Sequence, residues 1–420
     1  MSRPCSSQLA PSPYDQGGHS LEAEPVTSAS ASVRPARLAP LYAAGFVTAF
    51  GAFSVAAGLG ATGEEIGLSL LRIGVLLALY DVAEVLLKPV FGSLSDRIGA
   101  KPVIVGGLLA FAVLSLLGLG ADNALLLAGA RLGQGAAAAA FSPAASASVA
   151  RLAGAGRAGR YFGRYGSWKG LGYTLGPLLA AALIAVGGLP LLFGVLSASA
   201  GAVAVWVAVA LPAIPPLPRP RYTLVDLVKQ TTDRRFLVPT IALATSTAVL
   251  GASVGFLPAL ATADGADLVS AVAIASVLAV TLTVVQPWLG GLRDRGLLSD
   301  RAGTVLGLCV TATGVLAAAM PWGPGGLYLA AVLIGAGIGL VTPFAFAALA
   351  DSTPPERMGR TMGSAELGRE LGDSAGPLVV GGVATVATLP IGLAVLAAIA
   401  VAVAVGVALT PAKAGPAPAG

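Results

Sequence analysis

The chain has 420 residues, of which 56% are hydrophobic and 11% are charged, and its formal net charge is +5. Soluble domains carry about 25% charged residues, and a mean hydropathy of +0.85 is too high for a surface that faces water. The composition therefore excludes a soluble protein and predicts that most of the chain is embedded in a membrane. The basic residues lie between apolar runs rather than in a patch with interleaved aromatics, which excludes a nucleic-acid-binding protein.

Few residues of the chain are suited to covalent or metal chemistry. The two cysteines are Cys5, in a polar stretch, and Cys309, in an apolar run, and His19 is the only histidine. This set provides no disulfide framework, no metal site and no histidine-based triad. No Gly-Lys-Ser/Thr loop that would hold a nucleotide phosphate is present. We therefore expect a protein that is not an enzyme, binds no cofactor and is not driven by ATP.

The apolar segments, taken in chain order, predict twelve membrane-spanning helices. Residues 1–36 come first, and their Ser, Pro and Ala content without the apolar run of a signal peptide predicts a disordered cytoplasmic tail. A spanning helix needs about 20 mostly apolar residues. The predicted spans are 39–60, 72–92, 102–120, 124–149, 161–185, 189–211, 237–261, 268–291, 302–321, 326–350, 361–386 and 390–410.

Basic residues in the connecting loops predict the orientation of these helices. Arg and Lys gather after the second, fourth, eighth and tenth spans and in the proline-rich connection between the sixth and seventh. Because such loops stay on the cytoplasmic side, we expect both termini in the cytoplasm and the protein in the inner membrane. The predicted units are an N-terminal six-helix half, 37–211, a cytoplasmic linker, 212–236, a C-terminal six-helix half, 237–410, and a disordered tail, 411–420.

The two predicted halves are copies of one unit. Residues 131–178 match residues 331–378 at a constant offset, with Pro143 against Pro343 and Arg157 against Arg357. An internally duplicated twelve-helix membrane protein is typical of carriers that work by alternating access. The sequence therefore predicts an all-α membrane fold of two pseudo-symmetric halves.

Three motifs carry a resemblance to a known family. Residues 92–101 read Gly-Ser-Leu-Ser-Asp-Arg-Ile-Gly-Ala-Lys, residues 131–135 read Arg-Leu-Gly-Gln-Gly, and residues 172–177 read Gly-Tyr-Thr-Leu-Gly-Pro. In these motifs and over nearly the whole chain after the tail, the sequence resembles the major facilitator superfamily and its twelve-helix drug:proton antiporter branch. It departs from the antiporter motif at Ala180 and Ala181, where a closing Gly pair is common.

The resemblance implies roles for two sets of motif residues. The first set forms a gating latch between the halves. In the alternative interpretation, these residues are only cytoplasmic positive charges that set the orientation of the helices in the membrane. This set comprises Gly92, Asp96, Arg97, Gly99 and Lys101, with Asp294 and Arg295 as their echo in the second half. The second is the antiporter-like motif, a small-residue strip for close helix packing followed by a bend. It comprises Gly172, Gly176 and Pro177, with Gly376 and Pro377 as their echo.

Ionisable residues inside the predicted spans are the strongest candidates for function, because charge within a membrane is costly. Asp81, Glu84 and Lys88 share one helix face by their spacing, and a second cluster occupies one face of the eleventh span. The complete candidate set for proton coupling is Asp81, Glu84, Lys88, Arg131, Lys169, Glu366, Arg369, Glu370 and Asp373.

The resemblance places the second and eleventh spans side by side. Lys88 is then expected to pair with Glu370 or Glu366, and Arg369 with Glu84 or Asp81. In one interpretation these pairs only lock the halves together. In the other, an acid takes up a proton when its partner moves away. Arg131 is either a residue that snorkels to the outer interface or, as the resemblance implies, a residue that controls proton uptake by a nearby acid.

These features predict a proton-coupled secondary transporter that exports a small amphipathic molecule. The alternatives are a proton-coupled importer of a metabolite and a non-transporting membrane receptor or scaffold. The expected partners are the small-molecule substrate, protons and membrane lipid, without nucleic acid, and the expected state is a monomer.

Overall fold

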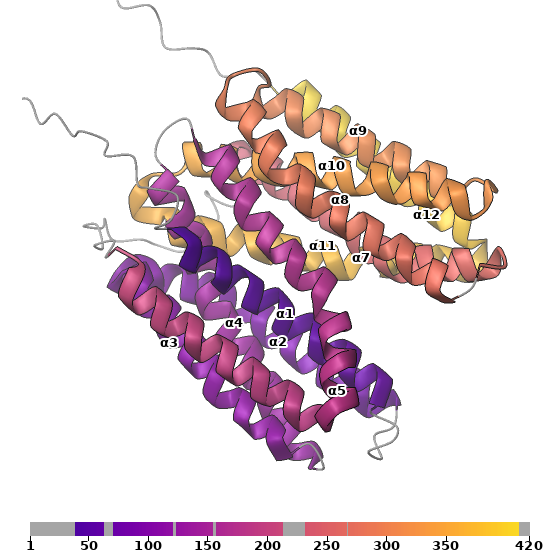
Figure 1. Ribbon diagram of the computed structural model, residues 1–420. Coiled ribbons are helices and arrows are strands. Elements are labelled where there is room, and N and C mark those ends of the chain that lie inside the picture. Colours follow the sequence, from indigo (N-terminus) through magenta and orange to yellow (C-terminus); the bar gives the residue numbers. More distant parts are fainter. Residues whose placement is uncertain are drawn as a thin grey trace, which may run out of the picture. The chain divides into compact units, whose positions relative to one another are not determined.

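The computed structural model describes residues 38–62, 70–120, 123–153, 157–212, 232–266 and 268–410, and every element within them is helical (Figure 1). The two predicted tails and most of the predicted linker lie outside this part of the chain. The N-terminal half contains α1 (Ala39–Thr62), α2 (Leu70–Ile98), α3 (Ala100–Ser115), α4 (Ala124–Ala153) and α5 (Ala158–Ala210). The C-terminal half contains α7 (Arg234–Ala263), α8 (Leu268–Asp294), α9 (Asp300–Ala318), α10 (Gly323–Ser352), α11 (Met358–Val386) and α12 (Leu389–Leu409). Short 3-10 turns follow α3 (Leu116–Gly120) and precede α11 (Pro355–Arg357).

The long helix α5 contains two of the predicted spans. Its backbone leaves helical geometry at Gly187 and Gly188, and Gly188 has a φ of 68°, which favours glycine. After α5, the carbonyl oxygen of Leu211 accepts a hydrogen bond of 2.8 Å from Nζ of Lys101, at the start of α3. Helices therefore cover all twelve predicted spans, and the fifth and sixth are joined through a glycine break.

Nine of the described helices are long and apolar enough to cross a membrane, and α2 and α11 are not among them. Both have suitable length, but their intramembrane charges lower the hydropathy. The two helices pack against each other, α2 from the N-terminal half and α11 from the C-terminal half. Their charged faces therefore find partners across the interface between the halves rather than facing lipid.

The interface between the halves is built twice from equivalent parts. The pair α2 and α11 is matched by the pair α8 and α5. In each pair glycines allow backbone contact: a Cβ at Gly92 would meet the carbonyl oxygen of Gly359, and one at Gly290 would meet that of Gly159. The repeat seen in the sequence therefore reappears as two pseudo-symmetric helix crossings.

The small-residue strips of the antiporter-like motif pack within each half. Gly172 and Gly176 lie against α1, where a Cβ at Gly176 would come 3.3 Å from the Cβ of Phe53. Gly376 lies against α7, and a Cβ there would collide with the carbonyl oxygen of Ala248. Pro177 and Pro377 lie inside α5 and α11. Both strips thus bring helix backbones together, more tightly in the second half.

Candidate functional site: the charged interface between the halves

Asp96, near the end of α2, binds the beginning of α11. Its Oδ1 accepts a hydrogen bond from the backbone N–H of Gly359 at 2.8 Å, and its Oδ2 accepts one from Arg360 at 2.9 Å. Arg151, at the end of α4, pairs with Oδ1 at 2.8 Å and also donates to the carbonyl oxygen of Pro355. A carboxylate is favoured there because the first N–H groups of a helix lack intrahelical partners and carry partial positive charge. We call Asp96, Arg151, Gly359 and Arg360 the Asp96 latch.

Asp294, at the end of α8, repeats this arrangement at the beginning of α5. It accepts hydrogen bonds from the N–H groups of Gly159, at 2.9 Å, and Arg160, at 2.8 Å. We call these three residues the Asp294 latch. Beside it, Arg293 pairs with Asp300 at 2.6 Å and with Asp351, which aligns with Arg151 in the repeat. Each half therefore places a carboxylate on a helix start of the other half.

The basic residues of the loop motif do not hold these carboxylates. Arg97 and Arg295 are exposed, and Lys101 binds the Leu211 carbonyl. Asp96 instead pairs with Arg151, one of the basic residues that follow the fourth predicted span. The glycines behave as the turn requires, since Gly99 has a φ of 95° between α2 and α3.

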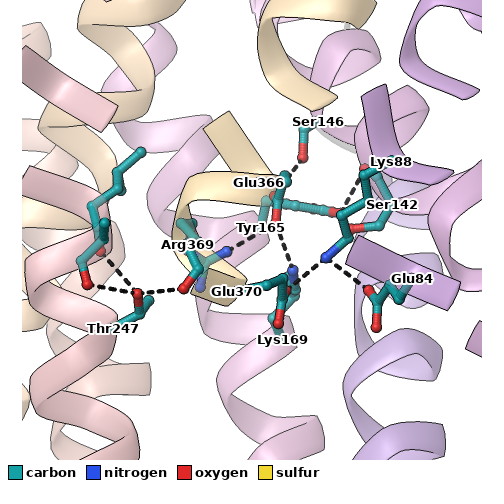
Figure 2. A network of polar contacts seen from close by, with 12 residues as sticks. Glu84, Lys88, Ser142, Ser146, Tyr165, Lys169, Thr247, Glu366, Arg369 and Glu370 are labelled. Carbon is teal, nitrogen blue, oxygen red and sulfur yellow. Dashed lines mark hydrogen bonds and ion pairs between the residues drawn. The ribbon is translucent and has the colours of Figure 1, made fainter. Parts of the chain in front are cut away.

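Lys88 lies between Glu84 and Glu370 among the intramembrane charges (Figure 2). Its fully buried ammonium group is 2.8 Å from Oε1 of Glu84 and 2.6 Å from Oε1 of Glu370. The expected pair between Lys88 and Glu370 is therefore present. A lysine buried within a membrane is stabilised only when carboxylates surround it in this way.

Glu366, also fully buried, is held by partners from three helices. Its Oε2 is 3.4 Å from Nζ of Lys169 on α5 and 3.2 Å from Nη1 of Arg369 on α11. Its Oε1 accepts a hydrogen bond of 3.1 Å from the hydroxyl of Ser146 on α4 (Figure 2). The expected pairing of Arg369 with Glu84 or Asp81 is wrong, because Arg369 reaches Glu366 one turn away on its own helix.

Arg131 does not snorkel. Arg131 is only 2% exposed to solvent. Its guanidinium group lies 4.3 Å from the centre of the Tyr80 ring, and its Nη1 donates a hydrogen bond of 3.4 Å to Oε1 of Gln134. An arginine stacked on an aromatic face is stabilised by the ring quadrupole. Arg131 is thus fixed inside the N-terminal half rather than at a membrane interface.

Several cavities lie beside these charges in the described part of the chain, and two of them have the most lining residues. One, of about 430 Å³, is lined by residues of α5, α7, α8, α10 and α11, including Tyr165, Lys169, Gln286 and Arg369. The other, of about 690 Å³, is lined by residues of α1, α2, α4, α5 and α11. We call the larger one the Asp81 cavity; its lining includes Phe53, Tyr80, Asp81, Arg131, Tyr173 and Asp373. No group of three or more His, Cys, Asp or Glu residues in the described segments is placed to hold a metal ion.

Comparisons with known proteins identify the family of this chain. The family model of the Major Facilitator Superfamily matches residues 41–377. The chain belongs to this superfamily. The predicted major facilitator fold is therefore confirmed, and the chain is a multi-pass membrane protein with a transporter fold.

Individual relatives cover less of the sequence. The class H tetracycline resistance protein of Pasteurella multocida is 35% identical over 127 residues, which is 30% of this chain and 32% of that protein. The inner membrane transport protein YajR of Escherichia coli is 33% identical over 147 residues, 34% of this chain and 31% of that protein. The chain thus matches about a third of the length of either relative.

Solved structures match the fold over most of the chain. The human organic anion transporter MFSD10 aligns with a TM-score of 0.72 at 18% identity, covering 89% of this chain and 99% of that one. A fucose:proton symporter of Escherichia coli aligns with a TM-score of 0.71 at 15% identity, covering 88% and 98%. Since an anion transporter and a sugar symporter share the fold, fold alone does not identify the substrate.

Proposed function

We propose that this transporter exports a small amphipathic molecule from the cytoplasm in exchange for protons. It would do so as a monomer in the inner membrane, with both termini in the cytoplasm. The observation that carries the proposal is the convergence of nine ionisable side chains, from α2, α4, α5 and α11, at the interface between the halves. Ionisable groups at this depth are costly, and they persist where ions or charged substrates pass.

The two latches control the alternation of the transporter between its two open states. Both consist of a carboxylate bound to a helix start across the interface, so one rocking motion of the halves breaks both. The basic loops predict that this end of the bundle faces the cytoplasm. With both latches formed, the cytoplasmic end is closed, and the opposite end is free to exchange substrate and protons.

Proton coupling is assigned to the acids of α2. Lys88 pairs with Glu84 of its own helix and with Glu370 of the other half. When α2 and α11 separate, the three-membered cluster of Glu84, Lys88 and Glu370 loses a member and its protonation changes. A membrane potential of about 100 mV gives roughly 2.3 kcal/mol for each charge moved, so one proton per cycle suffices for substantial export.

Direction is supported by two observations. The motif of Gly172, Gly176 and Pro177 resembles that of antiporters, and its glycines pack α5 closely on α1. Close packing limits the proton leak that an exchanger must suppress. A tetracycline resistance protein is also among the partial relatives.

The test compares accumulation of a panel of amphipathic cations, anions and neutral compounds in cells with and without the protein. We expect expressing cells to accumulate less of at least one class, and a protonophore to remove the difference. Greater accumulation in expressing cells while the gradient is intact would show import and contradict the proposal. Deletion of residues 1–36 serves as a control, since a scaffold would depend on its tail and a carrier would not.

A further inference from the structure

Two aromatic rings from opposite halves stack on each other at the interface. The rings of Phe162, on α5, and Phe346, on α10, have their centres 5.2 Å apart, and their planes are nearly parallel at 14°. Both residues are buried, with 1% and 3% of their surface exposed. Because α5 belongs to the N-terminal half and α10 to the C-terminal half, the two rings separate when the halves move apart at this point.

The stack lies between the Asp294 latch and the interior of the bundle. Phe162 follows Gly159 of the latch by three residues, which is about 4.5 Å along α5. Phe346 precedes Asp351, which forms its ion pair beside the latch, by five residues, or about 7.5 Å along α10. Both rings line the cavity of about 430 Å³, and its lining continues further into the bundle along both helices. The rings therefore occupy the end of this cavity that faces the latch.

The side of the interface that carries the stack is poor in charge. At the offset of the repeat, Glu366 and Glu370 of α11 correspond to Gly166 and Gly170 of α5. The two acids bind buried bases where α11 meets the N-terminal half, whereas the two glycines face uncharged side chains of α8. Closure on this side, inward of the Asp294 latch, therefore depends on the packing of neutral groups, and the stacked rings are part of it.

The repeat does not duplicate the stack. The positions equivalent to Phe346 and Phe162 hold Ser146 and Met362. Ser146 crosses between the halves by donating a hydrogen bond to Glu366. The two halves therefore meet through a polar contact at one of these equivalent places and through an aromatic contact at the other.

An arginine connects the stack with the buried charges. The guanidinium group of Arg369 lies over the ring of Phe346, 5.7 Å from its centre, which is within the distance at which a cation is attracted to an aromatic face. Its Nη1 is also 3.2 Å from Oε2 of Glu366. Arg369 is thus fixed by a carboxylate and in turn restrains the ring of Phe346.

A stack of this kind is suited to stop protons. Protons cross a protein along water molecules and hydrogen-bonding side chains, and a phenyl ring has no hydrogen-bonding atom. Apolar constrictions close a pathway because they exclude water. We propose that Phe162 and Phe346 form an aromatic seal that prevents protons from leaking between the cavity and the latch end of the bundle, and that Arg369 positions Phe346 in this seal. The inference goes beyond the proposed function, because a seal is needed whichever way the substrate moves.

The test measures passive proton leak in proteoliposomes that contain the purified full-length protein and no substrate. The lumen is acidic and contains a pH-sensitive dye, potassium and valinomycin hold the membrane potential at zero, and the rate in empty liposomes is subtracted. Phe162→Ala and Phe346→Ala should each raise the rate of luminal alkalinisation by about 2- to 12-fold. This factor corresponds to the loss of a stacking energy of about 0.5–1.5 kcal/mol.

Phe50→Ala is the matched control. Phe50 is also buried and stacks on another phenylalanine, Phe46, with ring centres 5.6 Å apart, but both residues lie on α1. This variant should leak as little as the wild type. Equal leak by Phe50→Ala and Phe346→Ala would overturn the proposal, because the effect would then follow from any loss of a buried ring.

Two further variants test the pairing of the rings. Phe346→Leu keeps a large apolar side chain, so it should fold even if the alanine variant does not, and it should leak more than the wild type. The double variant Phe162→Ala, Phe346→Ala should leak less than the product of the two single effects, because either change alone removes the shared contact. A wild-type rate in Phe346→Leu and in a well-folded Phe346→Ala protein, or a double effect as large as the product, would overturn the seal.

The role of Arg369 is tested by charge. Arg369→Gln should raise the leak, and Arg369→Lys, which keeps a cation near the ring, should raise it less. Asp264→Asn is the control for loss of a charge, because Asp264 is an exposed acid at the end of α7, and it should leak as the wild type does. Equal leak by the wild type and Arg369→Gln would overturn the positioning role.

Proton leak is measured without substrate, so the two proposals fail separately. If the ring variants leak as expected and cells import the substrate, the export proposal is wrong and the seal stands. If cells export the substrate and the ring variants leak no more than the wild type, export stands and the seal is wrong.

Discussion

Replacing Asp96 with Asn should open the end of the bundle that the two latches close. The Asp96 carboxylate accepts two backbone N–H groups of α11, at 2.8 and 2.9 Å, and pairs with Arg151 at 2.8 Å. Asn keeps the size of the side chain. Its amide nitrogen, however, is a donor that would face one of the two N–H groups, and its neutral oxygen attracts Arg151 only weakly.

The expected energy follows from these contacts. Hydrogen bonds to charged groups contribute about 1.5–3 kcal/mol each, and the variant loses one of them together with most of the Arg151 pair. We therefore expect the closed state to lose about 2–4 kcal/mol relative to the open state. This corresponds to a shift of about 30- to 1,000-fold in the equilibrium between them.

The shift is measured as a distance between spin labels at Ile98 and Leu297, two exposed positions that follow Asp96 and Asp294 in opposite halves. Cys5 and Cys309 are first replaced by Ser. The wild type should give mainly the short distance, and the Asp96→Asn protein mainly a longer one. Asp264→Asn should give the wild-type distribution.

The distance measurement is paired with transport in vesicles at equal protein level, where Asp96→Asn should turn over slowly. An unchanged distance distribution together with a wild-type transport rate would contradict this prediction, because the Asp96 latch would then not hold the cytoplasmic end closed.

Four further outcomes are expected. Asp294→Asn should shift the label distance as Asp96→Asn does, and the double variant should shift it further, since the two latches lie on separate helix pairs. Glu366→Gln should lower the free energy of unfolding by about 3–5 kcal/mol, because it leaves Lys169 and Arg369 without their buried carboxylate. An unchanged melting temperature would contradict this. Asp81→Asn should abolish uphill transport driven by a pH gradient while sparing downhill exchange, and equal uphill rates would place coupling elsewhere. Gly176→Leu should reduce export far more than Gly176→Ala, because a single Cβ nearly fits beside Phe53. Gly376→Ala should already reduce export, because its Cβ would collide with the carbonyl oxygen of Ala248. Drug accumulation in cells that express each of the three variants tests both expectations.

The sequence was sufficient to predict the fold because its signals are local. Apolar length marks each span, and the repeat with matched Pro and Arg positions defines two halves. The break at Gly187 and Gly188 was visible in the sequence as the gap between the fifth and sixth predicted spans. The expected contact of α2 with α11, and with it the pair of Lys88 and Glu370, came from the family resemblance.

The details of the site depend on which rotamers reach across a helix crossing, and spacing along a chain does not reveal them. The sequence places acids near Arg369 on both α2 and α11, and in the structure Arg369 pairs with Glu366 on its own helix. Arg151 stood among several loop cations, and only the position of Asp96 beside the end of α4 distinguishes it. In the described part of the chain, neither Asp81 nor Asp373 has an ion-pair partner. The sequence could not show this, because it follows from the partners that the other charged side chains take in the structure.

In the proposed function, protons and substrate move in opposite directions through this protein. The direct measurement uses proteoliposomes with an acidic lumen and a pH-sensitive dye inside, to which the compound selected by the cell screen is added. We expect the compound to accumulate in the lumen above its outside concentration while the lumen becomes more alkaline, and we expect Asp81→Asn vesicles to show neither change. Movement of protons and compound in the same direction, or accumulation without any change in luminal pH, would contradict it.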